Sequence, residues 1–188
     1  IYPKFYQDLK KVLDTGKVGL FQLRLKKYSL KQKIIIGKKI HQICKENKVK
    51  FLVNDDPVLS KKLNADGCHL GQKDMSVKNA RKIIGNKIIG ITCHNSIRLA
   101  KAAVKDKASY IALGAFFSTT TKKVKFKANT KILNEVKKLT KTPIVAIGGI
   151  NFNNYKKLLL NNANLLAISG YVWNNKKLKP IEAIELLK

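Results

Sequence analysis

The sequence predicts an α/β fold, a TIM-type (β/α)8 barrel with short loops, formed by a single domain over residues 1–188. Short apolar segments bounded by turn residues recur along the chain, and an amphipathic segment follows each of them. Strands that alternate with helices in this way build a parallel sheet. No linker or low-complexity block divides the chain, and its length suits one domain. A doubly wound open sheet would use five or six strands, so the larger number visible here favours the barrel.

Seven segments are predicted as strands, because each is short, apolar and bounded by turn residues: 18–24, 50–54, 67–70, 87–92, 109–113, 143–147 and 164–169. The segments between and after them have the amphipathic pattern of helices: 29–47, 56–64, 76–84, 95–105, 129–140, 151–161 and 180–187. Ser76, Asn95–Ser96 and Asn151 resemble helix starts. An eighth strand is needed to close the barrel, and we expect Ile1 and Tyr2 to be its last residues.

The composition argues against several classes of function. Lys and Arg number 39 against 11 acidic residues, which gives a net charge of +28. Only three of the basic residues are arginines, whose planar fork specific nucleic-acid readers use, so we expect no nucleic-acid partner. No apolar run approaches the roughly 18 to 20 residues that cross a bilayer, so we expect no membrane association. Three cysteines without CxxC spacing indicate buried thiols in the reducing cytoplasm.

Polar or glycine residues follow the carboxyl end of nearly every predicted strand. They are Gln22, Arg24 and Lys26; Asn54, Asp55 and Asp56; Gln72 and Asp74; Thr92 and His94; Ser118 to Lys122; Gly148 and Gly149; Ser169 and Gly170. In a βα barrel these ends meet on one face, which is where active sites form. The sequence therefore predicts one site assembled from many strands.

The residue types at these strand ends indicate phosphate and metal chemistry. Arg24, Lys26 and Lys122 supply positive charge. The glycine-rich ends at 148–149 and 169–170 precede helices, where free N–H groups bind phosphate. Asp55 and Asp74 end neighbouring strands, and two carboxylates beside phosphate-binding cations suit Mg²⁺.

A simpler role for both acids stays open. Asp55 could cap the helix that starts near Pro57, and Asp74 the helix that starts near Ser76. Their joint position beside Arg24 favours the metal site instead. A diphosphate held by metal and cations is a leaving group, so the expected reaction transfers an alkyl group away from pyrophosphate.

In order along the chain, FQLRLK, LVNDDP, ADGCHLGQKD, IIGITCHN, ALGAFFSTTTKK, PIVAIGGI and LLAISG resemble the signature segments of the thiamine phosphate synthase family, within the thiazole tautomerase superfamily. The resemblance runs from about Phe21 to Gly170. It implies a transferase that joins a hydroxymethylpyrimidine diphosphate to a thiazole phosphate and releases pyrophosphate with Mg²⁺. The implied partners are these small phosphorylated substrates, and assembly into a homo-oligomer is compatible with the sequence.

The resemblance also implies roles for individual residues. Catalytic roles fall to Arg24, Lys26, Thr92 and Lys122, and the metal to Asp55 and Asp74. The implied substrate-binding residues are Gln22, Asn54, Thr119, Thr121, Gly149, Ser169 and Gly170. The loop 115–128 is the expected lid over the site. Leu25, Ala115 and Ser118 depart from the family's pattern, and none of them is an expected phosphate or metal contact.

Three other interpretations were weighed. A thiazole tautomerase of the same superfamily would need neither diphosphate nor metal, and His94 keeps it open. A barrel that binds a thiamine precursor or RNA without turnover is disfavoured by the intact charged residues. A zinc site at Cys68–His69 and Cys93–His94 is disfavoured because consecutive strand residues point to opposite faces.

Overall fold

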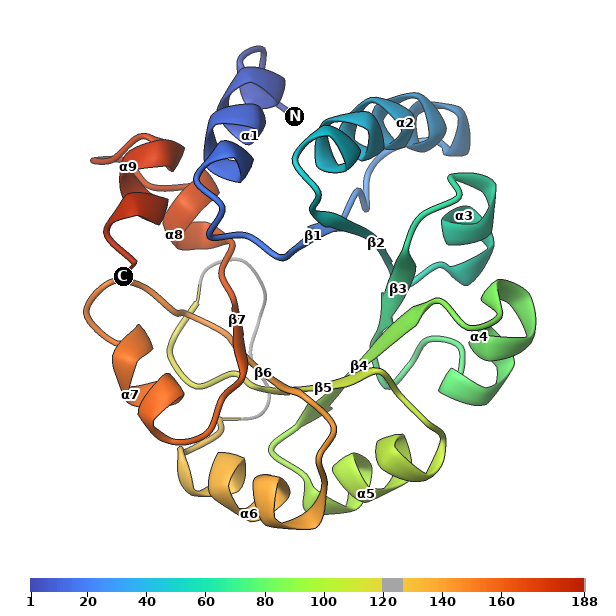
Figure 1. The fold of residues 1–188 in the computed structure, drawn as a ribbon, viewed down its shortest axis with the longest axis vertical. Helices are drawn as coiled ribbons and strands as arrows, with labels where there is room; N and C mark the ends of the chain where they lie inside the picture. The colour runs from blue at the N-terminus through green and yellow to red at the C-terminus, as the bar shows by residue number, and fades with distance from the viewer. Residues whose placement is uncertain (120–126, 188) are drawn as a thin grey trace. The chain divides into compact units, whose positions relative to one another are not determined.

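The computed structural model describes residues 1–119 and 127–187, and its contacts group into two compact units, Ile1–Ile89 and Gly90–Lys188. The boundary falls within strand β4 (Ile88–His94). Figure 1 follows the chain through both units from the N-terminus to the C-terminus. Each unit is described by itself, and a single domain over 1–188 stays a prediction.

The first unit is a parallel sheet covered by helices on one face. Its strands β1 (Leu20–Leu23), β2 (Lys50–Asn54) and β3 (Gly67–Leu70) pair in chain order, with Phe21 opposite Phe51 and Val53 opposite Cys68. Helices α2 (Leu30–Glu46), α3 (Pro57–Lys62) and α4 (Val77–Ile84) lie on one side of these strands, and α1 (Phe5–Asp14) precedes β1 (Figure 1). The repeated strand–helix order therefore places the carboxyl ends of all three strands at the same edge.

The second unit repeats the same plan. Strands β4, β5 (Tyr110–Gly114), β6 (Ile144–Ile147) and β7 (Leu165–Ala167) pair in parallel and in chain order. Helices α5 (Ile97–Lys105), α6 (Lys131–Leu139) and α7 (Tyr155–Leu160) lie between them in sequence. Two short helices, α8 (Gly170–Trp173) and α9 (Pro180–Glu185), follow β7 and pack on each other.

The predicted elements agree with the observed ones, with three differences. All seven predicted strands are present, and β3 has the predicted bounds. The expected eighth strand is wrong for the residues assigned to it, because Ile1 and Tyr2 lie outside any strand and lead into α1. Helices α1 and α8 were not predicted, and α7 begins at Tyr155 rather than near Asn151. Asn151 instead holds the turn before that helix, where its N–H donates to the Asn154 side chain.

Apolar residues of β2 to β6 supply much of the core of their own units, whereas those of β7 are exposed or half-buried. Phe51, Leu52 and Val53 of β2 are at most 1% exposed, and the residues of β5 are all buried. A strand buried on both faces reads as a continuous apolar run rather than an alternating one, which is why the sequence shows such runs. None of the described helices combines the length and the low polarity that a bilayer crossing requires.

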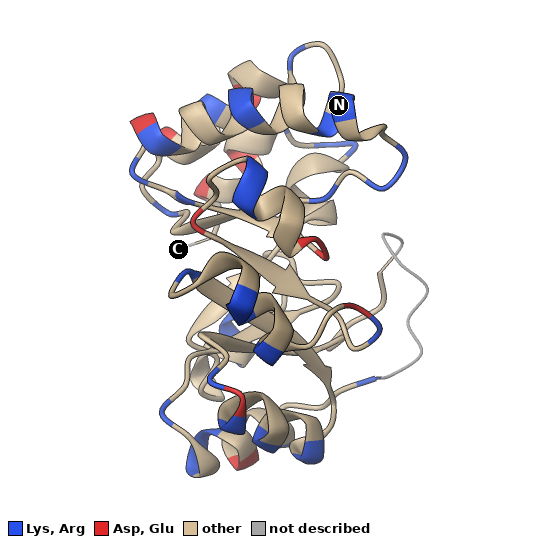
Figure 2. Cartoon of the chain, turned by 90° about the vertical axis from the view of Figure 1, so that its right-hand side faces the viewer, with Lys and Arg blue, Asp and Glu red and all other residues tan. Residues whose placement is uncertain are grey.

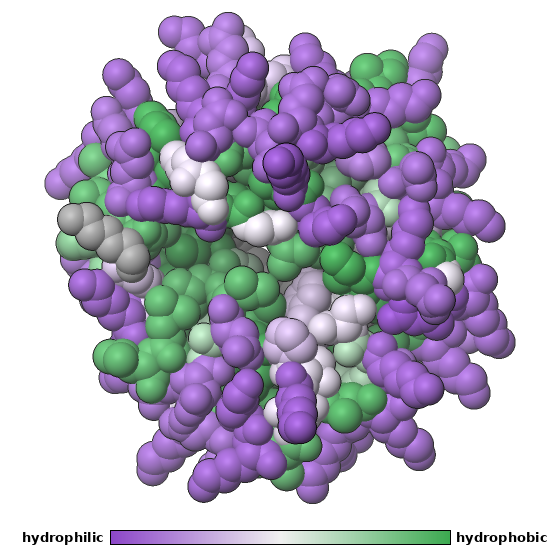
Figure 3. Space-filling model, viewed as in Figure 1, coloured by the Kyte–Doolittle hydropathy of each residue, from purple (hydrophilic) through white to green (hydrophobic). Residues whose placement is uncertain are grey.

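The surface is basic but not uniformly so. Lysines and arginines lie on helices of both units (Figure 2), and hydrophilic side chains dominate the outer part of the face drawn in Figure 3. Hydrophobic side chains gather over α7 in the same view, where Leu160 is 84% exposed. Among the described residues, the lysines are spread over many elements of both units.

Candidate active site

The carboxyl ends of β1 and β2 bring together two of the predicted substrate-binding residues. The Gln22 side-chain amide donates a hydrogen bond of 2.6 Å to the Asn54 side-chain oxygen. Both side chains are half-buried, and they come from strands that are direct neighbours in the sheet. The bond fixes the Asn54 side chain so that its amide nitrogen remains available for an acceptor such as a phosphate oxygen.

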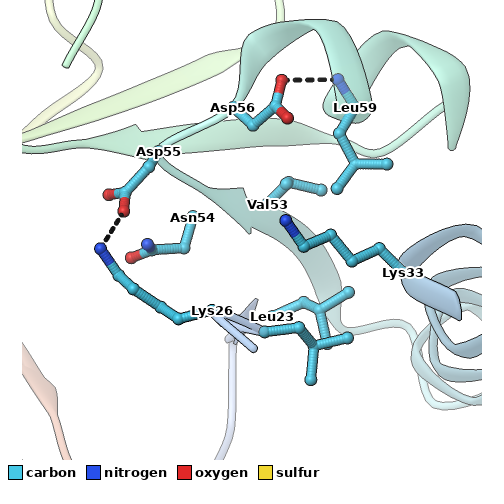
Figure 4. Close-up of a pocket in the computed structure, with 9 residues that line it drawn as sticks. Leu23, Lys26, Lys33, Val53, Asn54, Asp55, Asp56 and Leu59 are labelled. Carbon is cyan, nitrogen blue, oxygen red and sulfur yellow. Dashed lines mark hydrogen bonds and ion pairs between the residues drawn. The ribbon is translucent and has the colours of Figure 1, made fainter. Parts of the chain in front are cut away.

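Lys26 and Asp55 form a salt bridge at the same edge. The Lys26 ammonium lies 2.9 Å from the Asp55 carboxylate (Figure 4). Partial burial acts to raise the pKa of Asp55, but hydrogen bonds with Lys26 and Asp74 and the charges of Lys26 and Arg24 lower it overall. Asp55 therefore carries a negative charge at neutral pH, as a metal ligand must.

The backbone of Asp55 has a left-handed conformation, with φ of 65°. Aspartate is one of the few residues with a side chain that visits this region without a large penalty. The Asp55 N–H donates to the His69 carbonyl at 2.7 Å, which ties the end of β2 to β3. This turn directs the Asp55 side chain away from helix α3, which Asp56 caps.

Asp74 closes a tight turn after β3. Its carboxylate accepts a hydrogen bond of 2.7 Å from the Gly71 N–H, and its own N–H donates to the Gly71 carbonyl at 3.1 Å. A side chain at Gly71 would approach the Asp74 carboxylate to 2.9 Å, so glycine leaves room for it. Partial burial, together with the hydrogen bond and negative charge of Asp55, raises the pKa of Asp74 against the opposing effect of the Gly71 N–H.

Neither acid caps a helix, which answers the alternative that the sequence left open. The cap of α3 is Asp56, whose carboxylate accepts from the Leu59 N–H at 2.9 Å (Figure 4). The cap of α4 is Ser76, whose hydroxyl accepts from the Asn79 N–H. Asp55 and Asp74 therefore do not cap these helices, and a side-chain hydrogen bond joins them instead.

A pocket of about 250 Å³ opens beside these residues. Its lining is mixed, with apolar residues from β1, β2 and α3 and charged residues at the rim: Leu23, Leu25, Lys26, Lys33, Val53, Asn54, Asp55, Asp56 and Leu59. The side chain of Lys33 reaches into it from α2 (Figure 4). Nothing in the sequence distinguishes Lys33 from the many other lysines, because its position in the pocket depends on how α2 packs.

The remaining described candidates lie in the second unit. Thr92 is in β4 beside a register shift that falls between Thr92 and His94, and both are half-buried. Gly149 follows β6, and Ser169 immediately precedes α8, which begins at Gly170. Each candidate thus lies at or after the carboxyl end of its strand, as predicted.

The glycine pair after β6 packs against the segment that follows β5. Gly148 and Gly149 have φ of 97° and 64°, and the Gly148 carbonyl accepts from the Phe117 N–H at 3.1 Å. A side chain at Gly149 would come within 2.3 Å of the Ser118 carbonyl, so this close approach requires glycine. Asn154, which the sequence analysis did not select, donates to the Gly149 carbonyl at 3.1 Å and holds the turn.

Some expected site residues lie outside the described part of the chain. Thr121 and Lys122 fall in the segment 120–126, as does much of the expected lid 115–128. Thr119 is described and is half-buried. The roles of Thr121 and Lys122 therefore stay predictions.

The described acids suit Mg²⁺ better than Zn²⁺. Mg²⁺ takes one or two protein carboxylates and completes its coordination with water and phosphate oxygens, and Asp55 and Asp74 supply such a pair. Zinc sites use three or four His, Cys or acidic ligands. The described residues contain no group of three such side chains placed to hold a metal. Two neighbouring carboxylates beside a lysine are residues that could hold a hard cation such as Mg²⁺.

Comparison with known proteins places the chain in a family. The family model for thiamine monophosphate synthase matches residues 3–172. A thiamine-phosphate synthase of Pelagibacter ubique (strain HTCC1062) is 65% identical over 184 residues, which cover 98% of this chain and 89% of the relative. One from Rhodospirillum centenum (strain ATCC 51521 / SW) is 37% identical over 172 residues, covering 91% of this chain and 83% of the relative.

The fold agrees with this similarity. The solved structure of thiamine phosphate pyrophosphorylase from Pyrococcus furiosus aligns with a TM-score of 0.87 and 28% identity, and covers 97% of this chain and 86% of that one. This match confirms the predicted TIM-type α/β fold class. With a family model that spans most of its length and relatives that cover nearly all of it, the chain belongs to the thiamine monophosphate synthase family.

Proposed function

We propose that the chain is a thiamine phosphate synthase, a transferase that joins hydroxymethylpyrimidine diphosphate to thiazole phosphate and releases pyrophosphate. The observation that carries the proposal is the pairing of Asp55 with Asp74 beside Lys26, at the strand ends where this fold places its active sites. The 65% identity to a thiamine-phosphate synthase over 98% of the chain supports the same reaction.

In the proposed reaction the bond between the pyrimidine methylene carbon and the diphosphate oxygen breaks, and its electron pair leaves with the diphosphate. The thiazole nitrogen then donates its lone pair to the methylene carbon, and a carbon–nitrogen bond forms. The departing group gains negative charge as the first bond breaks. Positive groups placed at that oxygen stabilise this change more than they stabilise the bound substrate, which is what accelerates the step.

The residues of the first unit are proposed to hold the diphosphate. Arg24 and Lys26 supply positive charge, and the Asn54 amide, oriented by Gln22, donates a hydrogen bond. Asp55 and Asp74 would hold Mg²⁺, which when bound neutralises part of the charge on the diphosphate oxygens. Gln22 and Thr92 are proposed to line the pyrimidine side.

The residues of the second unit are proposed to hold the thiazole phosphate. Gly149 and the pair Ser169–Gly170 present backbone N–H groups at strand ends, where phosphate is bound in many α/β proteins. Thr119 and Thr121 would add hydroxyl donors, and Lys122 would join the cations around the diphosphate. We place the reaction in the cytoplasm, consistent with three buried free cysteines among the described residues.

The test is a direct assay with both phosphorylated precursors and Mg²⁺. We expect one pyrophosphate and one thiamine phosphate per turnover, and loss of product when EDTA removes the metal. Asp55→Asn keeps the size of the side chain but removes its charge, so it should lower kcat by about a hundredfold or more. Full activity in EDTA would contradict the metal role. Interconversion of carboxylated thiazole tautomers without thiamine phosphate would identify a tautomerase instead.

A further inference from the structure

The salt bridge between Lys26 and Asp55 joins two groups that the proposed function needs elsewhere. Lys26 is assigned to the diphosphate and Asp55 to the metal, yet in the free protein they lie 2.9 Å apart and satisfy each other. A carboxylate oxygen that accepts from an ammonium cannot give the same lone pair to a metal ion. The ammonium likewise has fewer hydrogens left for a phosphate oxygen.

We propose that Lys26, which forms an ion pair with Asp55 in the free protein, binds the diphosphate instead when metal and diphosphate bind, so that the pair opens. This inference rests on the proposed function. Opening transfers the Lys26 ammonium to the diphosphate and leaves the Asp55 carboxylate to the metal. Metal binding at Asp55 frees Lys26 for the diphosphate, and diphosphate binding at Lys26 frees Asp55 for the metal. The two ligands therefore bind cooperatively, and each raises the affinity for the other by the same factor.

The structure makes this exchange inexpensive. The Lys26 side chain is 57% exposed and the Asp55 side chain 29%, so the pair lies at the protein surface rather than in the core. Exposed ion pairs contribute at most about 1 kcal/mol, which corresponds to about a fivefold change in a binding constant. The Lys26 side chain can also swing without moving the backbone, whereas Asp55 is fixed by its left-handed turn and its N–H bond to His69.

The site offers matched controls for both partners. Arg24 also acts on Asp55 through its positive charge, but no salt bridge joins the two among the described residues. The charge of Lys26 also acts on Asp74, but the Asp74 side chain forms its hydrogen bonds with Gly71 and Asp55. Removing Arg24 or Asp74 therefore changes the charge of the site by one unit and leaves the Lys26–Asp55 bond in place.

The metal side is tested with Mn²⁺ and no diphosphate, by the electron paramagnetic resonance signal of free Mn²⁺ over a protein titration. We expect Lys26→Met to raise the affinity for Mn²⁺ about three- to fivefold beyond the change in Arg24→Met. If Lys26 merely adds charge, both variants gain equally, and that result overturns the inference. Melting temperatures of both variants show whether the fold is kept.

The anion side is tested with pyrophosphate in EDTA, by calorimetric titration. We expect Asp55→Asn to bind metal-free pyrophosphate about three- to fivefold more tightly than Asp74→Asn does, because only the first change releases Lys26. Equal affinities of the two variants would contradict the pair's role. If the unaltered protein binds no Mn²⁺ at millimolar concentration, the metal assignment fails and this inference falls with it. If it binds Mn²⁺ and makes thiamine phosphate while the paired variants match their controls, only the inference fails.

Discussion

At the scale of single residues, neighbouring acids in this chain have different tasks. Asp55 and Asp56 are adjacent, yet one forms a salt bridge with Lys26 and the other caps α3. The difference comes from one backbone angle, the left-handed φ of Asp55, which turns its side chain away from the helix. A charge count or a motif match treats the two acids alike, but their contacts do not.

The raised pKa of Asp74 predicts that metal binding depends on pH. The folded protein holds the Asp74 proton more tightly than an ordinary carboxyl with a pKa of 3.8 does. A metal must displace that proton, so Mn²⁺ affinity should fall as pH decreases through the raised pKa. Asp74→Asn should weaken Mn²⁺ binding by about tenfold or more and remove this dependence. The measurement is Mn²⁺ titration between pH 4 and 8, and an unchanged pH profile in the variant would contradict the role of Asp74.

A third acid, Asp66, is predicted to stabilise the fold. Its carboxylate accepts from the Phe51 N–H at 2.9 Å and forms a salt bridge of 3.0 Å with Lys50. Burial acts to raise the pKa of Asp66, but these two contacts lower it overall. The contribution of Asp66 to the free energy of unfolding is therefore present above the ordinary carboxyl pKa and is lost as pH falls through the lowered pKa. Asp66→Asn should reduce the free energy of unfolding by about 1–2 kcal/mol at pH 7.

Urea denaturation at pH 7 and near pH 3 measures this effect. The difference between Asp66→Asn and the unaltered protein should shrink at the lower pH. Asp106→Asn is the matched control, because Asp106 is an exposed acid whose side chain forms no hydrogen bond or salt bridge with the described residues. Equal losses in the two variants would show that Asp66 acts only as a surface charge.

At the scale of secondary structure, the β2–α3 and β3–α4 units place the helix cap and the proposed site acid on different residues. Asp55 lies between the end of β2 and the capped start of α3. Asp74 lies between the end of β3 and the capped start of α4. The cap fixes the first residue of the helix, and the proposed site residues lie between the end of the strand and that cap. Such an arrangement lets the site residues change without loss of the helices.

The two neighbouring acids test this separation. Asp56→Ala removes the cap of α3, so it should cost about 1 kcal/mol of stability and keep the synthase activity. Asp55→Asn keeps a residue that tolerates the left-handed backbone, so it should have the opposite pattern, with little loss of stability and loss of metal-dependent activity. Thermal unfolding and the pyrophosphate-release assay, measured on both variants, separate the two roles. Loss of activity in Asp56→Ala at a temperature where it is folded would contradict the assignment.

At the scale of the whole molecule, the buried cysteines report on both units. Cys44 in α2 and Cys68 in β3 lie in the first unit, and Cys93 in β4 lies in the second. All three are 0% exposed, and burial raises the pKa of each thiol to about 12. Since the thiolate is the reactive form, the folded protein should protect all three.

Thiol labelling at pH 8 should therefore follow unfolding. We expect no fast reaction in native buffer and three reactive thiols per chain in concentrated urea. Mass spectrometry of peptides at intermediate urea concentrations shows whether Cys93 becomes reactive together with Cys44 and Cys68. A common transition would mean that the two units unfold as one domain, as the sequence analysis predicts. Rapid labelling of one thiol in native buffer would contradict the burial.

The sequence by itself determined the alternation of strands and helices, the convergence of polar residues at strand ends and the family. These follow from local patterns, because apolar runs, turn residues and caps act over a few neighbours in the chain. It also selected Asp55 and Asp74, although it left helix capping open for both. It missed α1 and α8 and placed an eighth strand at Ile1–Tyr2, where the observed chain leads into a helix.

The tertiary structure alone decided which acid does what. Three contacts join residues on different strands or across a turn. They are the hydrogen bond from the Asp55 N–H to the His69 carbonyl, the one from the Gly71 N–H to the Asp74 carboxylate, and the salt bridge between Lys26 and Asp55. The entry of Lys33 into the pocket also depends on the packing of α2. Such contacts are set by distances between elements, which no single stretch of sequence contains, and they are the reason that Asp56 and Ser76 cap helices while Asp55 and Asp74 do not.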